Sequence, residues 1–300
     1  MTDEQPWTVG RLLNWTTDFL RDKGADSPRL DAEVLLAHAR GCQRIELYTA
    51  FEEEAAEPLR EAFRELVRRR AGGTPVAYLV GHREFFSMSF RVTSDVLIPR
   101  PESELLVVRV LDLAKTLAKG RALRIADVGT GSGILAVCCA KYLPTSTVTA
   151  IDISPMALAV AQANAEQHGV ADRIEFVASD LFAKRQAPEA CNEEHNIEDY
   201  DIIISNPPYV ASAELAGLDA DVRDHEPHLA LDGGEQGTEV IERLIPQAAE
   251  RLKPGGWLLM EVGPNNAALV EQLVADSGLA LQDTIADLAG HPRVVQAEKS

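Results

Sequence analysis

Short apolar runs and amphipathic stretches alternate along the second half of the chain. Each apolar run predicts a buried strand, and each stretch of helical period predicts a covering helix. The expected strands are 123–128, 147–152, 173–178, 200–205, 256–262, a segment near 279–285, and 292–297. The expected helices are 133–142, 155–168, 237–252 and 265–276. This alternation predicts an α/β fold, with a mostly parallel sheet and helices on both of its faces.

The residues before position 80 follow a helical period instead. A first helix is predicted by an apolar stripe of Leu12, Leu13, Trp15, Phe19 and Leu20. A second helix begins at Ser27-Pro28 and runs through Ala39, and a third covers 57–70. We expect a small helical domain at 1–80. Partner recognition and a lid or stabilising cap are both open as its role.

The period changes between these two regions. From 82 to 100, apolar Phe86, Met88, Phe90 and Val92 alternate with polar residues, which predicts a β-hairpin. A helix is expected from 102 to about 118. The expected organisation is therefore a helical domain at 1–80, a β-hairpin linker at 81–100 and an α/β domain at 101–300.

Composition and charge narrow the class of protein. Of the 300 residues, 46% are hydrophobic and 25% charged, as in soluble globular proteins. The formal net charge of −18 repels nucleic acid phosphates, apart from a local basic patch at 68–70, so we expect no direct nucleic acid partner. No apolar run is long enough to span a bilayer, and the acidic N-terminus lacks a signal peptide. We therefore expect a cytoplasmic protein without a membrane partner.

The cysteines show no metal-binding pattern. Cys42, Cys138, Cys139 and Cys191 form no CxxC pair, so we expect no metal. Cys191 and His195 lie within 183–199, a polar and acidic segment longer than the usual α/β connection. We interpret that segment as a solvated surface loop.

A glycine-rich loop follows the first strand of the α/β region. Its residues are Gly129, Thr130, Gly131, Ser132 and Gly133. Glycines permit a sharp turn and close approach of a ligand, and the following helix adds free N–H donors. The spacing is GxGxG and not the GxGxxG of dinucleotide-binding folds.

Acidic residues end the next two strands. Asp152 ends strand 147–152, where an acid can accept hydrogen bonds from both hydroxyls of a ribose. Asp180 and Leu181 follow strand 173–178, where an acid can accept from an adenine amino group. Singly, each acid also suits a helix cap or a turn. In order along successive strand ends, they favour a nucleotide-like cofactor.

The segment Asn206-Pro207-Pro208-Tyr209 follows strand 200–205. The prolines fix their own φ angles and hold Asn206 at the carboxyl end of the strand, where open α/β sheets bind ligands. Asn206 offers an acceptor and a donor, the prolines offer carbonyls, and Tyr209 offers a flat face. This set suits a planar amide or amino group.

Together, segments 127–133, 150–152, 179–182 and 205–209 resemble class I S-adenosylmethionine-dependent methyltransferases of the NPPY type. Within that class the chain is similar to the HemK-type protein-(glutamine-N5) methyltransferases. The stretches that carry this likeness are 27–36, 68–70, 73–79, 83–86, 97–104, 222–227 and 287–290. The resemblance covers nearly the whole chain.

The resemblance implies a Rossmann-like, seven-stranded domain that binds S-adenosyl-L-methionine and releases S-adenosyl-L-homocysteine. The implied cofactor-binding residues are Gly129, Thr130, Gly131, Ser132, Gly133, Asp152, Asp180, Leu181 and Asn206. The implied substrate-binding residues are Arg100, Asn206, Pro207, Pro208 and Tyr209, of which Asn206, Pro207 and Tyr209 are the catalytic ones. Arg100 stands between two prolines, and a surface charge is the alternative there. Some relatives carry an aromatic residue where Leu181 stands.

The implied reaction methylates the side-chain amide nitrogen of a glutamine, in a GGQ-type motif of peptide chain release factors. Asn206 Oδ1 and the Pro207 carbonyl would each accept one amide N–H, and Tyr209 would pack on the amide plane. Two alternatives share the same core: a glutamine of a ribosomal protein, and the N6 amine of adenine in a nucleic acid. The net charge disfavours the last of these. We expect a monomer.

Overall fold

The computed structural model describes residues 6–183 and 200–300. The predicted loop at 183–199, with Cys191 and His195, therefore lies outside the described residues except for Ala183. The chain divides into two compact units. One contains Met1–His82 and Asp219–His225, and the other contains Arg83–Leu218 and Glu226–Ser300. In the described part of the chain, no helix is long and apolar enough to cross a membrane.

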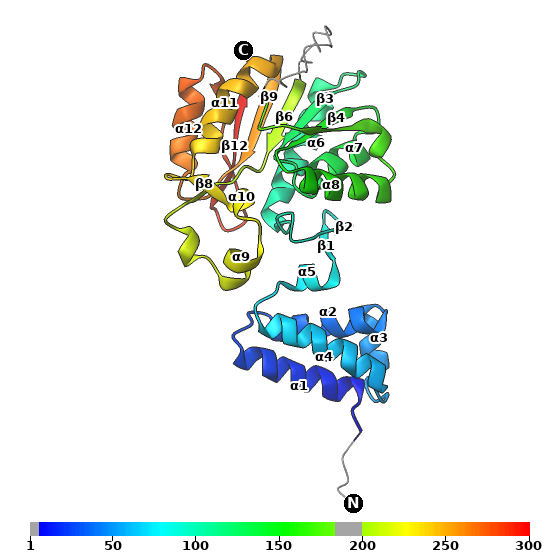
Figure 1. Cartoon of the computed structure of the whole chain (residues 1–300). Helices are drawn as coiled ribbons and strands as arrows, with labels where there is room; N and C mark the ends of the chain where they lie inside the picture. Colours follow the sequence, from blue (N-terminus) through cyan, green and yellow to red (C-terminus); the bar gives the residue numbers. More distant parts are fainter. Residues whose placement is uncertain (1–5, 184–199) are drawn as a thin grey trace, which may run out of the picture. The chain divides into compact units, whose positions relative to one another are not determined.

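The first unit is helical (Figure 1). Its helices are α1 (Val9–Asp22), α2 (Pro28–Arg40), α3 (Arg44–Thr49), α4 (Glu57–Ala71), α5 (Val76–Val80) and α9 (Ala220–His225). Pro28 occupies the first turn of α2, and Gly41 ends that helix with φ of 68°. The three predicted helices are present. The short helices α3, α5 and α9 were not expected from the sequence.

The core of this unit is formed by Leu13, Leu35, Leu36, Leu47 and Phe63, with other apolar residues of the same helices. Two ion pairs join elements of the unit. Arg70 of α4 binds the buried Asp31 of α2 at 2.7 Å, and Arg44 of α3 binds the buried Glu33 of α2 at 2.8 Å. Trp15 departs from the predicted stripe, because its side chain is 51% exposed and stacks on Phe19.

The second unit is built around a sheet that, within the described residues, has eight strands. The order is β10-β12-β9-β6-β3-β4-β5, with β11 also paired to β12. The strands are β3 (Arg124–Val128), β4 (Thr147–Asp152), β5 (Ile174–Ala178), β6 (Tyr200–Ser205), β9 (Leu252–Glu261), β10 (Ala280–Leu281), β11 (Ile285–Ala286) and β12 (Pro292–Glu298). The pairings among β3, β4, β5, β6 and β9 are parallel, and β12 runs antiparallel to β9. The predicted α/β class is confirmed, with eight strands in the described sheet in place of the seven implied by the resemblance.

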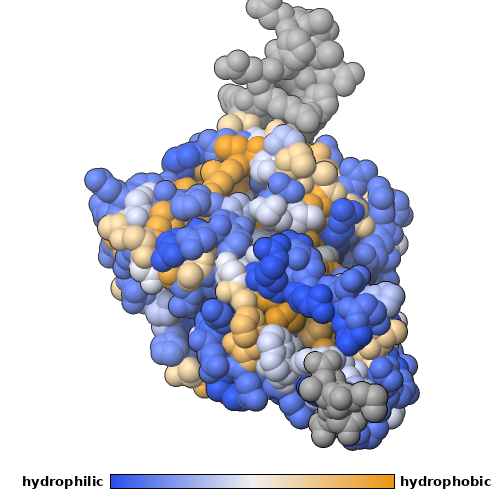
Figure 2. All heavy atoms as spheres, turned by 60° about the horizontal axis from the view of Figure 1, so that its bottom comes forward, coloured by the Kyte–Doolittle hydropathy of each residue, from blue (hydrophilic) through white to orange (hydrophobic). Residues whose placement is uncertain are grey.

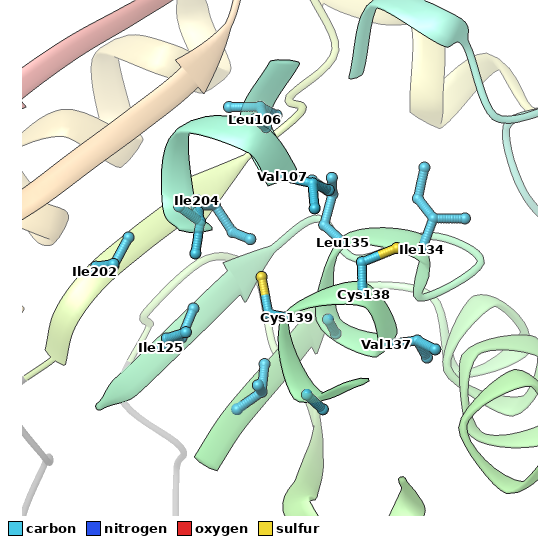
Figure 3. Close-up of a cluster of buried hydrophobic side chains, with 14 of the residues drawn as sticks. Leu106, Val107, Ile125, Ile134, Leu135, Val137, Cys138, Cys139, Ile202 and Ile204 are labelled. Carbon is cyan, nitrogen blue, oxygen red and sulfur yellow. The ribbon is translucent and has the colours of Figure 1, made fainter. Parts of the chain in front are cut away.

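Helices cover both faces of this sheet (Figure 1). On one face α6 (Glu104–Leu117) and α7 (Ile134–Tyr142) pack with Ile202 and Ile204 of β6, as Figure 3 shows. On the other face α11 (Glu239–Arg251) and α12 (Ala267–Asp276) pack with Ile203. Successive residues of a strand point to opposite faces, so a strand buried on both sides reads as one continuous apolar run. The helix α8 (Pro155–Gln167) follows β4.

The structure corrects three details of the expected elements. The strand near 279–285 is two short strands, β10 and β11, and Gln296 Nε2 of β12 donates to the Asp283 carbonyl between them at 2.6 Å. The hairpin is short, with β1 (His82–Phe85) and β2 (Met88–Arg91). Phe86 lies in its turn, with φ of 48°, and not in a strand. The helix expected from 102 begins with a 3-10 turn, η1 (Pro101–Ser103).

Several short elements complete the chain. They are η2 (Ala171–Arg173), β7 (Val210–Ala211), η3 (Leu215–Gly217), α10 (His228–Leu231) and β8 (Asp232–Gly234). β7 pairs with β8 in a small parallel sheet directly after Tyr209. Figure 2 shows a mostly hydrophilic face with scattered hydrophobic patches, as the composition leads one to expect.

Candidate active site

The carboxyl ends of β3 and β6 meet where the strand order of the sheet reverses. β4 pairs with one side of β3 and β6 pairs with the other. Connections that leave on opposite sides of the sheet open a crevice at this point. The glycine loop follows β3 and Asn206 follows β6. These two segments are close, since a Cβ built on Gly129 would lie 3.9 Å from the Asn206 carbonyl oxygen.

A cavity of about 270 Å³ lies at these strand ends. Most of the residues singled out from the sequence line it: Arg100, Gly129, Thr130, Gly131, Ser132, Asp152, Asp180, Leu181, Asn206 and Pro208. Gly133, Pro207 and Tyr209 are not among the lining residues. The fold therefore brings together residues from four successive strand ends.

The glycine loop is held from beneath by Asp127. Its Oδ2 accepts hydrogen bonds from Thr130 Oγ1 at 2.6 Å and from the Ala136 N–H at 3.0 Å. Asp127 is fully buried, and burial raises its pKa to about 7 even though these hydrogen bonds oppose the shift. Its other oxygen, Oδ1, is buried and has no hydrogen-bond partner within the described residues. Asp127 was not predicted as a site residue from the sequence.

Gly133 has a packing function in place of a lining position. It precedes α7 with φ of 81°, and a Cβ there would lie 2.9 Å from the Ala161 side chain of α8. A larger residue would therefore push the two helices apart. The predicted cofactor contact of Gly133 remains a prediction.

Asp152 connects the loop to the end of β4. Its Oδ2 accepts from the Gly131 N–H at 2.8 Å, and its Oδ1 accepts from the Ser154 N–H at 2.9 Å. Burial raises the pKa of Asp152, and these backbone hydrogen bonds oppose that shift. Each carboxylate oxygen has a second lone pair, so the group can still accept hydrogen bonds from a ligand in the cavity.

Asp180 is paired with a residue that sequence reasoning missed. Arg243 of α11 lies 2.5 Å from Asp180 Oδ2, and both residues line the cavity. The next residue, Leu181, is buried in the left-handed region at φ of 53°, which is unusual for a bulky side chain. The following Phe182 N–H donates to Gln247 Oε1 at 3.0 Å, which helps to fix this turn on α11.

The backbone after Asn206 is tightly packed. Pro207 is buried, and Tyr209 is half-buried. Asn266 Nδ2 donates to the Tyr209 carbonyl oxygen at 3.1 Å. Burial, and then the charge of Glu261, raise the pKa of Tyr209 to about 12, so its phenol keeps its proton at neutral pH. The segment is thus a rigid strand exit.

The side chain of Asn206 is the start of a buried hydrogen-bond chain. Asn206 Nδ2 donates to Ser103 Oγ at 3.2 Å, and Ser103 Oγ donates to Glu261 Oε2 at 2.5 Å. Ser103 and Glu261 were not predicted as site residues. Ser103 stood within the 97–104 stretch, and Glu261 near the end of an apolar strand, but no spacing connected them.

Arg100 is held by a buried acid. Arg100 Nη2 lies 2.6 Å from Glu226 Oε1, and Glu226 Oε2 accepts from the Ile98 N–H at 3.2 Å. Arg100 therefore lines the cavity, with its guanidinium held in place by Glu226. The alternative from the sequence, a surface charge, does not describe this position. No group of three His, Cys, Asp or Glu side chains among residues 6–183 and 200–300 could hold a metal ion.

Comparison with solved structures places this fold. The catalytic domain of hMettl16 in complex with the MAT2A 3'UTR hairpin 6 superimposes with a TM-score of 0.54 and 19% sequence identity. The match covers 79% of this chain and 82% of that chain. At this identity the likeness concerns the fold alone, which is that of the class I methyltransferases.

Sequence comparison identifies the family. A model described as the PrmC N-terminal domain matches residues 11–81, and one described as the methyltransferase small domain matches residues 110–221. The release factor glutamine methyltransferase of Rhodopirellula baltica is 48% identical over 301 residues, 100% of this chain and 99% of the relative. That of Koribacter versatilis is 42% identical, over 97% of this chain and 99% of the relative. The chain belongs to the release factor glutamine methyltransferase family.

Proposed function

We propose that the protein transfers a methyl group from S-adenosyl-L-methionine to the side-chain amide nitrogen of a glutamine in peptide chain release factors. The observation that carries this proposal is the placement of Asn206, at the cavity wall and with its Nδ2 already bonded to Ser103. Its acceptor oxygen is then available for an amide N–H. The names of the full-length relatives support the same substrate.

The residues present fit this cofactor. The turn at Gly129 and Gly131 has positive φ and offers backbone to the cavity, and Asp152 retains acceptor capacity for hydroxyl groups. The unpartnered Asp127 oxygen lies beneath the same loop. Gly129, Thr130, Gly131 and Ser132 would hold the methionine part, Asp152 the ribose, and Asp180 and Leu181 the adenine. The bound cofactor supplies a methyl group on a positively charged sulfur.

Orientation is the main contribution of the protein to catalysis. The lone pair of an amide nitrogen is delocalised into its carbonyl, so the nitrogen is a weak nucleophile. Asn206 Oδ1 and the Pro207 carbonyl would each accept one N–H of the substrate amide. Both acceptors would be better matched to the transition state, in which positive charge develops on that nitrogen. Tyr209 would cover the amide plane, and the displaced proton would pass to water.

The remaining features of the proposal concern partners and domains. We propose a monomer that acts in the cytoplasm and does not bind nucleic acid directly, in line with its net charge of −18. We also propose that the helical domain at 1–80 recognises the release factor and that 81–100 links it to the methyltransferase domain at 101–300. Arg100, fixed by Glu226, would contact the substrate.

The test is a comparison of substrates with one readout. The purified protein and S-adenosyl-L-methionine are incubated with a release factor, with ribosomal proteins and with DNA or RNA. Mass spectrometry of peptides and nucleosides then locates any added methyl group. We expect one methyl on a glutamine of the release factor. Methylation of a ribosomal glutamine or of adenine, with an unmodified release factor, would contradict the proposal.

A further inference from the structure

Three residues from distant parts of the sequence form one hydrogen-bonded chain beside segment 206–209, which is called the candidate clamp below. Asn206 follows β6, Ser103 ends η1, and Glu261 ends β9. Ser103 is 1% exposed and Glu261 is 2% exposed. The two contacts are Asn206 Nδ2 to Ser103 Oγ at 3.2 Å and Ser103 Oγ to Glu261 Oε2 at 2.5 Å.

The direction of each hydrogen bond follows from the charge at the end of the chain. A carboxylate only accepts, so an ionised Glu261 requires the Ser103 hydroxyl to donate to it. The hydroxyl has a single proton, and only its lone pairs then face Asn206. The Asn206 group beside it must therefore be the NH₂ donor, which turns Oδ1 the other way. Within the described residues, Oδ1 of Asn206 has no hydrogen-bond partner.

We infer, resting on the proposed function above, that Glu261 acts through Ser103 to hold the Asn206 amide with Oδ1 toward the substrate. Ser103 and Glu261 are thus positioning residues for the methyl transfer. With Oδ1 facing the substrate, the clamp accepts an N–H from the glutamine amide. With NH₂ facing it, two donors would oppose each other and the nitrogen would not be aligned.

Protonation of Glu261 would remove this control. A neutral carboxyl can donate to Ser103 Oγ, which frees the serine proton to donate to Asn206 Oδ1 and so favours the reversed amide. Burial raises the pKa of Glu261 to about 7, while the Ser103 hydrogen bond opposes the shift.

The charged and titratable groups that face Glu261 come from the surrounding segments: Glu102, Arg100, Arg293 and Tyr209. Glu102 raises the pKa of Glu261, whereas Arg293 and Arg100 lower it. Each arginine is itself bound to another carboxylate, Arg293 to Asp287 at 2.8 Å and Arg100 to Glu226 at 2.6 Å. As the pH falls through about 7, Glu261 takes up a proton, and the side-chain amide of Asn206 should no longer be held in one orientation.

The test compares Ser103→Ala, Ser103→Thr and Glu261→Gln in the full-length protein. Ser103→Ala removes the hydroxyl that connects Glu261 to Asn206, which is called the relay here. We expect kcat for release factor methylation to fall about tenfold to a hundredfold. KM and cofactor affinity should stay within about twofold, because the substitution removes one hydroxyl from the cavity lining and leaves Asp152, Asp180 and the glycine loop in place. Ser103→Thr keeps the hydroxyl and should restore most of the rate. Ser146→Ala, a buried serine outside the cavity lining, is the control and should have wild-type activity.

The pH dependence separates positioning from structure. In the wild type, kcat/KM should decline below about pH 7, and in both Ser103→Ala and Glu261→Gln this decline should disappear. Wild-type rates and pH profiles in Ser103→Ala would overturn the inference, whether or not Glu261→Gln folds.

A second readout does not depend on activity. The ¹⁵N-labelled side-chain amide signal of Asn206, assigned by its loss in Asn206→Ala, should shift with pH around 7 in the wild type and not in Ser103→Ala. An unshifted signal would also overturn the inference. If the wild type shows this shift but methylates no glutamine, the proposed function fails while the relay stands.

Discussion

Gly237 approaches Tyr209 so closely that a Cβ on the glycine would lie 2.7 Å from the Tyr209 carbonyl oxygen. Gly237 also has φ of 78°, a conformation that side chains rarely adopt. The loop between β8 and α11 thus supports the backbone of the candidate clamp.

Gly237→Ala should therefore be costlier than an ordinary glycine substitution. Left-handed strain alone costs on the order of 1 kcal/mol, and the clash with Tyr209 adds to it. Gly278→Ala is the matched control, because Gly278 has φ of 83° and nothing within 4 Å of a built Cβ. Urea denaturation should show a larger loss for Gly237→Ala, together with reduced methylation. Equal losses for the two variants would mean that the close approach has no energetic weight.

Asn206→Ala should reduce turnover and largely spare the fold. It removes the proposed amide acceptor but leaves β6 and both prolines in place. Loss of one preorganised polar group typically lowers kcat by roughly 10²–10³-fold. Asn206→Asp is a sharper variant, since it keeps an acceptor oxygen and adds a negative charge. A single-turnover rate for Asn206→Ala within about twofold of the wild type would show that this side chain is not the catalytic device.

Asp152→Ala should weaken binding of S-adenosyl-L-methionine. The substitution removes a charge-assisted hydrogen-bond acceptor for the cofactor. It also removes the carboxylate that accepts hydrogen bonds from the Gly131 and Ser154 N–H groups. The expected loss is on the order of 1.5–3 kcal/mol of binding free energy, measured by calorimetry. Asp180→Ala is a useful comparison, because that acid is already paired with Arg243. Unchanged affinity in Asp152→Ala would refute the ribose assignment.

Asp127 should make folding stability depend on pH. Burial raises its pKa in the folded protein to about 7 from the ordinary value of 3.8, so the folded state binds an extra proton between these two pH values. That contribution is present at acidic pH and is lost as the pH rises through about 7.

The wild type should therefore lose stability relative to Asp127→Asn between pH 5 and pH 8, by at most about 3 kcal/mol. Asn can keep the hydrogen bonds from Thr130 and Ala136, so the two proteins differ mainly in this titration. Urea unfolding at both pH values measures the difference. A constant stability gap would show that Asp127 is ionised throughout.

Deleting residues 1–70 should abolish methylation of an intact release factor while some cofactor binding remains. The cofactor residues all follow position 126, whereas the proposed recognition domain lies before position 81. Calorimetry with the cofactor is the control for folding of the remaining chain. Methylation at the full rate by the truncated protein would show that the helical domain is not needed for recognition.

The strand ends were accessible from sequence because their signals are local. The continuous run Ile202–Ile204 predicts a strand buried on both faces, and the bounds of β4 and β6 agree with the structure. Asp152 is the last residue of β4 and Asn206 directly follows β6, so the parallel strands bring them to one edge of the sheet. Elements of a few residues, such as α3 and β7, are too short to show a hydrophobic period that could be recognised in the sequence.

The partners of the site residues were not accessible in the same way. Ser103 and Glu261 are separated by 158 positions, and Asp180 and Arg243 by 63. Such pairs depend on how β9 and α11 are placed by the whole sheet, and a serine, glutamate or arginine alone gives no periodic signal. Leu181 illustrates the same limit, because its left-handed backbone is imposed by packing and not by its own preference.

The membership of α9 in the helical unit has a consequence for biosynthesis. Residues Asp219–His225 complete a unit whose other part ends at His82, so an entire stretch of α/β chain must be made before the last helix is available. At roughly 5–20 residues per second, a nascent N-terminal unit would wait on the order of ten seconds for α9. During that interval α1 to α5 would have to pack without α9.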